Sequence, residues 1–214
     1  MHIYIISQHL SLKGNGDDSF YKLAHHNVLK GHKVTVFASA DGLGMELGQK
    51  NIGLFQKDGI MMVAFNAPYN DQMSRIQMLA SYIKFARMAG KQGPLMPKPD
   101  ILIAATPPLS AVAPAIKLKQ FFKIPLVLEV RELWPDALVQ GGTLKNRFLI
   151  KKVSKFEEKV YRQSDRIVTG DREIAALIRE RCSEQEKVTA VTGRPEDHEI
   201  KMIYDRLIEE LALK

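Results

Sequence analysis

Arg131, Glu132 and Trp134 form the cluster in this sequence whose residue types are best suited to holding a polar ligand. They offer a guanidinium, a carboxylate and an indole within four positions, directly after a short apolar run at 126–130. Such a run is typical of a buried strand in a parallel sheet. Because ligands of open α/β sheets bind outside the carboxyl ends of the strands, we expect these three side chains at a ligand-binding edge.

Glu129 is a carboxylate inside that apolar run. Burying a carboxylate is costly unless it is paired with a cation or accepts hydrogen bonds. We therefore predict that Arg131 or a backbone N–H group is its partner.

Thr106 closes another buried strand, predicted at 100–105, and is followed by two prolines. The prolines end the strand and start a helix at 109–122, which leaves the Thr106 hydroxyl at the ligand-side edge. It is a candidate substrate-binding residue, and the alternative is a helix cap that touches no substrate.

Gly14, Asn15 and Gly16 form a loop between a first predicted strand at 2–7 and a helix that begins near Asp18. They are candidate substrate-binding residues, although the loop does not match the Gly-x-Gly-x-x-Gly pattern. The acidic residues that follow would compete with a phosphate for the free backbone N–H groups of the helix. A simple turn followed by an N-cap is the alternative.

Strands and helices alternate along the chain, which predicts a single Rossmann-like α/β domain with a mostly parallel twisted sheet and helices on both faces. The expected strands are 2–7, 33–38, 52–56, 60–65, 100–105, 126–130, 166–169 and 187–192. One expected helix begins after Asp18, and four others span 72–90, 109–122, 144–163 and 172–181. A C-terminal amphipathic helix carries Ile200, Ile203, Leu207, Ile208 and Leu211.

Length and composition indicate a globular protein with one core. The chain has 214 residues, 45% of them hydrophobic and 26% charged, which is enough for one domain of about 190 residues and a tail. The single Cys182 excludes an internal disulfide and a Cys-rich zinc site. No apolar run approaches the roughly 18 residues of a membrane span, so we expect a cytoplasmic protein.

The net charge of +7 is concentrated in the first two-thirds of the chain. Such a field fits an anionic lipid surface or a diphosphate-bearing substrate, whereas no motif typical of nucleic-acid binding is present. The helix at 72–90 could face a membrane on one side, or it could be an ordinary buried helix. Between positions 72 and 128, Asp100 alone opposes Arg75, Lys84, Arg87, Lys91, Lys98, Lys117, Lys119 and Lys123.

The stretch Glu-Val-Arg-Glu-Leu-Trp-Pro-Asp-Ala at 129–137, followed by Gly141-Gly142 and Leu-Lys-Asn at 144–146, resembles a known family. It is similar to the amino-terminal domain of retaining glycosyltransferases with the GT-B fold. Within them, it most resembles the sugar-nucleotide branch that builds O-antigen, capsule and similar glycans on lipid carriers. The resemblance runs from residue 1 to about 192 and is most specific at 125–180, although relatives usually carry Asp at position 132.

The resemblance implies roles for the cluster and divides the chain into two parts. Glu132 would be the catalytic residue that orients or polarises the acceptor hydroxyl, with an ion pair to Arg131 as the alternative. Arg131 would counter phosphate charge, Trp134 would offer a flat surface to the acceptor, and neither a metal nor a cofactor would be required. Residues 1–192 would be the acceptor-side half of a GT-B fold, and 193–214 a linker and a helix that packs back on it.

The predicted function is therefore sugar transfer from a nucleotide sugar to a glycan acceptor, such as one linked to a polyprenyl diphosphate. The domain that grips the donor, with its paired glutamates Glu-x7-Glu, is not found in this sequence. The isolated chain would then be an inactive half of a retaining enzyme, peripheral on the inner face of the membrane. The alternatives are a non-catalytic, membrane-docked scaffold or acceptor-binding module, and a flavodoxin-like nucleotide-binding domain unrelated to sugars.

Overall fold

A computed structural model of the chain describes residues 1–12, 18–70, 72–134, 136, 139, 142, 144–182, 185–191 and 198–212. The strands are β1 (His2–Ile6), β2 (Lys33–Ser39), β3 (Ile52–Lys57), β4 (Ile60–Phe65), β5 (Ile101–Thr106), β6 (Leu126–Val130), β7 (Arg166–Thr169) and β8 (Val188–Ala190). The helices are α1 (Ser19–Leu29), α2 (Arg75–Gln92), α3 (Leu109–Phe122), α5 (Arg147–Gln163), α6 (Arg172–Arg181) and α7 (His198–Ala212), with short 3-10 turns at Gly93–Leu95 and Gln185–Lys187.

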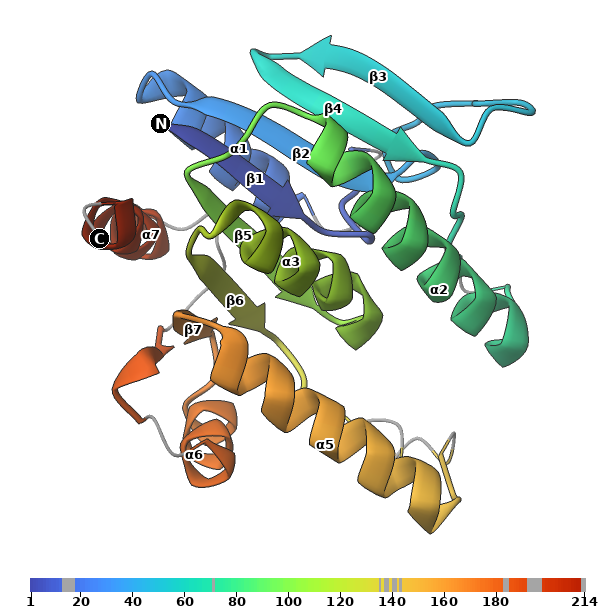
Figure 1. Cartoon of the computed structure of the whole chain (residues 1–214), viewed down its shortest axis with the longest axis vertical. Coiled ribbons are helices and arrows are strands. Elements are labelled where there is room, and N and C mark those ends of the chain that lie inside the picture. Colours follow the sequence, from blue (N-terminus) through green and yellow to red (C-terminus); the bar gives the residue numbers. More distant parts are fainter. Residues whose placement is uncertain are drawn as a thin grey trace.

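The eight strands form one sheet in the order β3-β4-β2-β1-β5-β6-β7-β8 (Figure 1). All neighbours are parallel except β3, which pairs antiparallel with β4 in a hairpin. The chain fills the sheet from β1 outward to β2 and β4, then returns to build the other half from β5. This reversal between β1 and β5 is a topological switch point, the usual place for a ligand in such a sheet.

Helices cover both faces of the sheet, as predicted (Figure 1). Helices α2, α3, α5 and α6 bury their apolar residues in one core cluster, exemplified by Phe85, Leu118 and Val160. Helices α1 and α7 bury theirs in a second cluster on the opposite face, exemplified by Leu23 and Tyr204. Because β6 is covered on both sides, all five of its residues are buried.

Two helices begin about three residues later than predicted, because polar caps decide where they start. Ser74 accepts a hydrogen bond from the Gln77 N–H, and Gln77 accepts one from the Ser74 N–H, so α2 begins at Arg75 instead of position 72. Asn146 Oδ1 accepts from the Phe148 and Leu149 N–H groups, so α5 begins at Arg147 instead of position 144.

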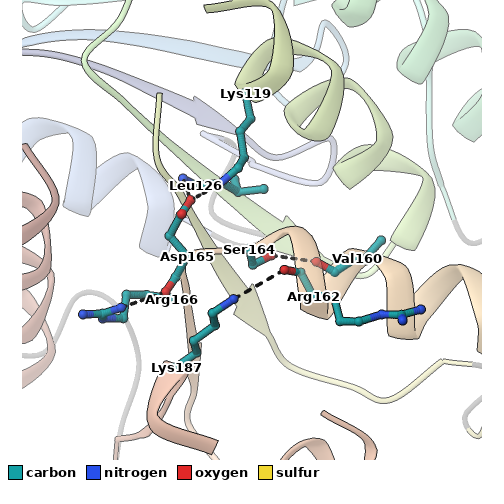
Figure 2. Close-up of polar contacts among 8 residues, drawn as sticks. All are labelled: Lys119, Leu126, Val160, Arg162, Ser164, Asp165, Arg166 and Lys187. Carbon is teal, nitrogen blue, oxygen red and sulfur yellow. Dashed lines mark hydrogen bonds and ion pairs between the residues drawn. The ribbon is translucent and has the colours of Figure 1, made fainter. Parts of the chain in front are cut away.

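The amino edge of the sheet is closed by polar contacts around Asp165, at the start of β7 (Figure 2). Its Oδ2 accepts a hydrogen bond of 2.8 Å from the Leu126 N–H and pairs with the Lys119 ammonium. Ser164 Oγ donates to the Val160 carbonyl at 2.9 Å and so ends α5 beside the same strand. The contacts tie α3, α5, β6 and β7 together at the edge remote from the carboxyl ends of the strands.

Helix α7 is held on the domain by charged contacts at its surface as well as by its apolar face. Asp205 lies 3.1 Å from Nε2 of His26 on α1 and 2.8 Å from Nζ of Lys30, which directly follows α1. Arg166 of β7 pairs with Glu210. Burial raises the pKa of Asp205, but the bonds from Lys30 and His26 outweigh burial and leave that pKa below its ordinary value.

Asp205→Asn is expected to lower the free energy of unfolding by about 1 kcal/mol near neutral pH. A carboxyl whose pKa is lowered by folding adds stability above its ordinary pKa of 3.8, and this stability disappears as the pH falls through the lower folded-state value. The difference in free energy of unfolding between wild type and variant should therefore shrink when urea denaturation is repeated at about pH 3. Glu209→Gln, at an exposed position of the same helix, is the control and should change little. An equal deficit at both pH values would contradict the assignment.

Candidate functional site at the carboxyl edge of the sheet

The carboxyl ends of the strands bring polar and aromatic residues together around the switch point. Gln8 and His9 follow β1, Tyr69 follows β4, Thr106 ends β5, and Arg131 and Glu132 follow β6. These segments are separate in the sequence and meet only because parallel strands end at one edge. The predicted cluster after β6 therefore lies where a ligand of this fold would bind.

Arg131 is held at this edge by a network that starts inside the protein. Its Nε donates to Glu129 Oε1 at 2.7 Å, its Nη2 donates to Ser19 Oγ at 2.8 Å, and its guanidinium lies 4.9 Å from the centre of the Phe20 ring. Glu129 is only 4% exposed and accepts a second hydrogen bond from the Tyr204 hydroxyl of α7. The predicted pairing of the buried carboxylate with Arg131 is thus present, and it fixes the guanidinium beside the start of α1.

Among the described residues, Glu132 makes none of the contacts given above for that network. Its side chain is exposed, and within the described residues it makes no ion pair with Arg131, which was the structural alternative for this carboxylate. Its negative charge lies close enough to Tyr82 of α2 to contribute to the raised pKa of the phenol. Burial is the main cause of that rise, with Tyr69 as a further contributor. Glu132 is therefore accessible to a ligand, at an edge of the sheet that also carries an aromatic group.

That aromatic group consists of His9, Tyr69 and Tyr82. The rings of His9 and Tyr69 are stacked with centroids 3.9 Å apart, and Tyr82 lies 5.7 Å from each of them. None of the three was among the site residues predicted from the sequence. The signal that could have found them is their position, because two of the rings directly follow predicted strands.

Gln8 anchors the loop that carries His9. It is 1% exposed, and its Nε2 donates to Ser81 Oγ of α2 at 3.0 Å and to the Ala67 carbonyl at 3.4 Å. Ser81 in turn donates to the Pro68 carbonyl at 2.7 Å. These bonds join the loops after β1 and β4 to α2, so the three segments that carry the aromatic rings are held in place relative to one another.

Trp134 is half-buried and packs against the core cluster under α5. Its backbone N–H donates to Glu157 Oε1 at 2.7 Å, and its indole N–H has no hydrogen-bond partner among the described residues. Thr106 is 2% exposed, and both peptide bonds from Thr106 through Pro108 are cis. Gly14, Asn15 and Gly16 lie outside the described residues.

Glu157 of α5 anchors the segment after β6 through hydrogen bonds from Trp134 and from Arg181. This carboxylate is 1% exposed and accepts hydrogen bonds from the Trp134 N–H, the Tyr161 hydroxyl at 2.9 Å and Arg181 Nη1 at 2.9 Å. Arg181 also pairs with Asp136. Burial raises the pKa of Glu157, although its three donors each favour the charged form. The position of Glu132 therefore depends on a buried group twenty-five residues further along the chain.

The described residues contain no group of three or more His, Cys, Asp or Glu side chains arranged to hold a metal ion. Among the helices in the same part of the chain, none combines the length and apolar character that crossing a bilayer requires.

Comparisons with known structures show the fold. A sucrose-phosphate synthase structure from Thermosynechococcus elongatus, whose name carries the numbers 27, 220, 406 and 426, aligns with a TM-score of 0.63 at 12% identity and covers 99% of both chains. Another structure of that synthase aligns with a TM-score of 0.61 at 12% identity over 89% of this chain and 47% of the other. Arabidopsis thaliana UGT89C1, complexed with UDP, aligns with a TM-score of 0.56 at 12% identity over 89% of this chain and 51% of the other.

The chain therefore spans about half the length of these last two structures. A search of curated protein sequences gave no significant match. A family model, however, matches residues 18–192, which include the cluster after β6 and most of the sheet. The chain belongs to the Glycosyl transferase 4-like domain family.

Proposed function

We propose that this chain is the acceptor-binding half of a retaining glycosyltransferase that moves a sugar from a nucleotide sugar to a lipid-linked glycan acceptor. Membership in the family supports sugar transfer. The observation that carries the acceptor-side assignment is the exposed Glu132 at the same edge of the sheet as an aromatic cluster, in a domain that spans 47% of a longer chain of similar fold. The donor would be gripped mainly by a second domain or subunit.

Three requirements of the reaction guide the assignment of roles. The bond from the anomeric carbon to the diphosphate oxygen breaks, a bond to the acceptor oxygen forms on the same face of the sugar, and the hydroxyl proton leaves with the departing diphosphate. Glu132 would accept a hydrogen bond from the acceptor hydroxyl and orient it. Arg131, held by Glu129 and Ser19, would place positive charge near the phosphates. Its fixed geometry means that little ordering is left for the moment of reaction.

The aromatic residues would add the surface against which the acceptor lies. Apolar faces of sugars and isoprenoid units pack well on aromatic rings, and His9, Tyr69 and Tyr82 already support one another. Trp134 would border the same site with the exposed part of its indole ring, whose N–H itself is buried. Thr106 and the loop at 14–16 would complete the acceptor and phosphate contacts. We place the reaction in O-antigen or capsule synthesis, on the cytoplasmic side of the membrane.

The test is a binding screen of the chain against short polyprenyl-diphosphate analogues and against nucleotide sugars, by calorimetry. We expect measurable binding of the diphosphate analogues and much weaker binding of the sugar donors, because the proposed role assigns the donor mainly to a second domain. Tight donor binding without acceptor binding would instead favour a nucleotide-binding domain unrelated to acceptors. Binding of neither ligand class would leave no support for the acceptor-side assignment and would favour the non-catalytic module.

A further inference from the structure

Helices α2 and α5 begin with turns that project beyond the rest of the domain. In Figure 1 both helices lie on the same face of the sheet, and both start at the end toward which the parallel strands point. Every described residue from Arg75 to Gln77 and from Lys145 to Leu149 is exposed. Helix ends of this kind contribute little to the core, so core packing does not explain which residue types they carry. Contacts outside the domain are the remaining explanation.

Both projecting ends carry large apolar side chains on the outside. On α2, Ile76 is 82% and Leu79 58% exposed, and Ile83 continues the same stripe one turn further. On α5, Phe148 is 65% and Leu149 47% exposed. Apolar side chains scattered singly over a surface need no explanation, but these gather at two helix starts that point the same way.

The same two helices carry cations and almost no acids. No Asp or Glu occurs from 72 to 99 or from 144 to 156. Within the described part of the chain, none of the cations on these stretches makes an ion pair with a carboxylate, although Lys152 lies 4.5 Å from the centre of the Phe148 ring. They are Arg75, Lys84, Arg87, Lys91, Lys98, Lys145, Arg147, Lys151, Lys152 and Lys155.

A groove joins the two helices across α3. Its volume is about 490 Å³, its floor is apolar, and its rim is cationic. It is lined by Ile83, Arg87 and Lys91 of α2, Pro114 and Lys117 of α3, and Phe156 of α5. The apolar stripe of α2 thus leads into a channel where phosphate groups would find three positive side chains.

From these features we infer that the first turns of α2 and α5, together with the groove between them, form a docking surface for an anionic lipid bilayer. Apolar tips surrounded by Lys and Arg suit a bilayer interface, where the tips enter the acyl boundary and the cations contact lipid phosphates. A protein partner would have to supply acidic groups along both helices at once, whereas an anionic membrane offers negative charge everywhere on its plane. Docking in this way would present the carboxyl edge of the sheet, and the candidate site, close to the membrane surface.

The inference is tested by co-sedimentation of the purified chain with phosphatidylcholine vesicles, with and without phosphatidylglycerol. The wild-type chain should bind the anionic vesicles, with binding weakened by salt, and should bind neutral vesicles poorly. The variant Ile76→Ser with Leu79→Ser should lower the partition coefficient by about tenfold. The variant Lys84→Gln, Arg87→Gln and Lys91→Gln should lower it by about tenfold or more on anionic vesicles only.

Matched controls use equally exposed residues elsewhere on the fold. Leu29→Ser with Met202→Ser removes two apolar side chains that are 74% and 59% exposed on α1 and α7. Lys33→Gln, Lys50→Gln and Arg206→Gln removes three exposed cations outside the surface. Both controls should bind vesicles within about twofold of wild type.

The inference is overturned if the wild-type chain ignores anionic vesicles, or if surface variants and controls lose binding equally. Loss of vesicle binding in the charge variant but not in the apolar variant would show that the apolar side chains do not enter the bilayer, and would also overturn the inference. The result is separable from that of the proposed function, because the diphosphate analogues in the calorimetric screen are water-soluble. A chain that binds those analogues but not vesicles would retain its acceptor role and lose only the docking surface.

Discussion

Glu157→Ala is expected to lower the free energy of unfolding by about 3–5 kcal/mol. The substitution removes the acceptor for three donors at once and leaves the Arg181 guanidinium, the Tyr161 hydroxyl and the Trp134 N–H without it. Each buried donor left unsatisfied costs about 1–3 kcal/mol, whereas Arg181 keeps its pairing with Asp136. Such a loss is a large fraction of the stability of an ordinary domain. Chemical denaturation followed by circular dichroism would measure it.

Glu158→Ala is the matched control, because it removes a carboxylate from the next position of the same helix, where the side chain is exposed. It should change stability by less than about 0.5 kcal/mol. Glu157→Gln should fall between the two, since an amide oxygen still accepts from the Trp134 N–H while its NH2 group opposes Arg181. Equal stability of Glu157→Ala and Glu158→Ala would show that the three hydrogen bonds contribute little and that the segment after β6 is held by packing alone.

Glu132→Ala is expected to slow sugar transfer by about 100-fold or more, once the chain is combined with a chain that supplies the donor domain. The expectation rests on the proposed role, in which this carboxylate orients the acceptor hydroxyl toward the anomeric carbon. Because Glu132 is exposed and supports no described contact in the fold, the variant should unfold at the same denaturant concentration as wild type. Steady-state kinetics with a polyprenyl-diphosphate acceptor analogue would place the loss mainly in kcat.

Glu132→Asp is the informative companion, since Asp is the residue that the resembled glycosyltransferases usually carry here. A carboxylate shortened by one methylene should retain most of the activity, whereas alanine should not. Transfer that proceeds at the wild-type rate in Glu132→Ala would exclude the role. In that case, the aromatic cluster of His9, Tyr69 and Tyr82 would be the next place to look for groups that position the acceptor.

Local regularities in the sequence were sufficient for the fold and for part of the site. Buried parallel strands read as apolar runs, so β5 and β6 were located to within a residue or two. Glu129 and Arg131 lie two positions apart at the end of one strand, where alternate side chains share a face, so their pairing could be predicted. The starts of α2 and α5 were missed because caps such as Ser74 and Asn146 end the turn before them, although the Ser-x-x-Gln pattern was available as a signal.

What the sequence by itself determined was the mostly parallel sheet and the edge at which polar residues would gather. Only the tertiary structure decided which residues meet there. Tyr204 reaches Glu129 across 75 positions, Ser19 reaches Arg131 across 112, and Glu157 holds Trp134 from a different helix. The periodicity of a strand or helix depends on residues that are close together in the sequence. Contacts at the carboxyl edge depend instead on how distant segments cross over the sheet. That is why the aromatic partners of Glu132 and the shared projection of α2 and α5 became visible only in the folded chain.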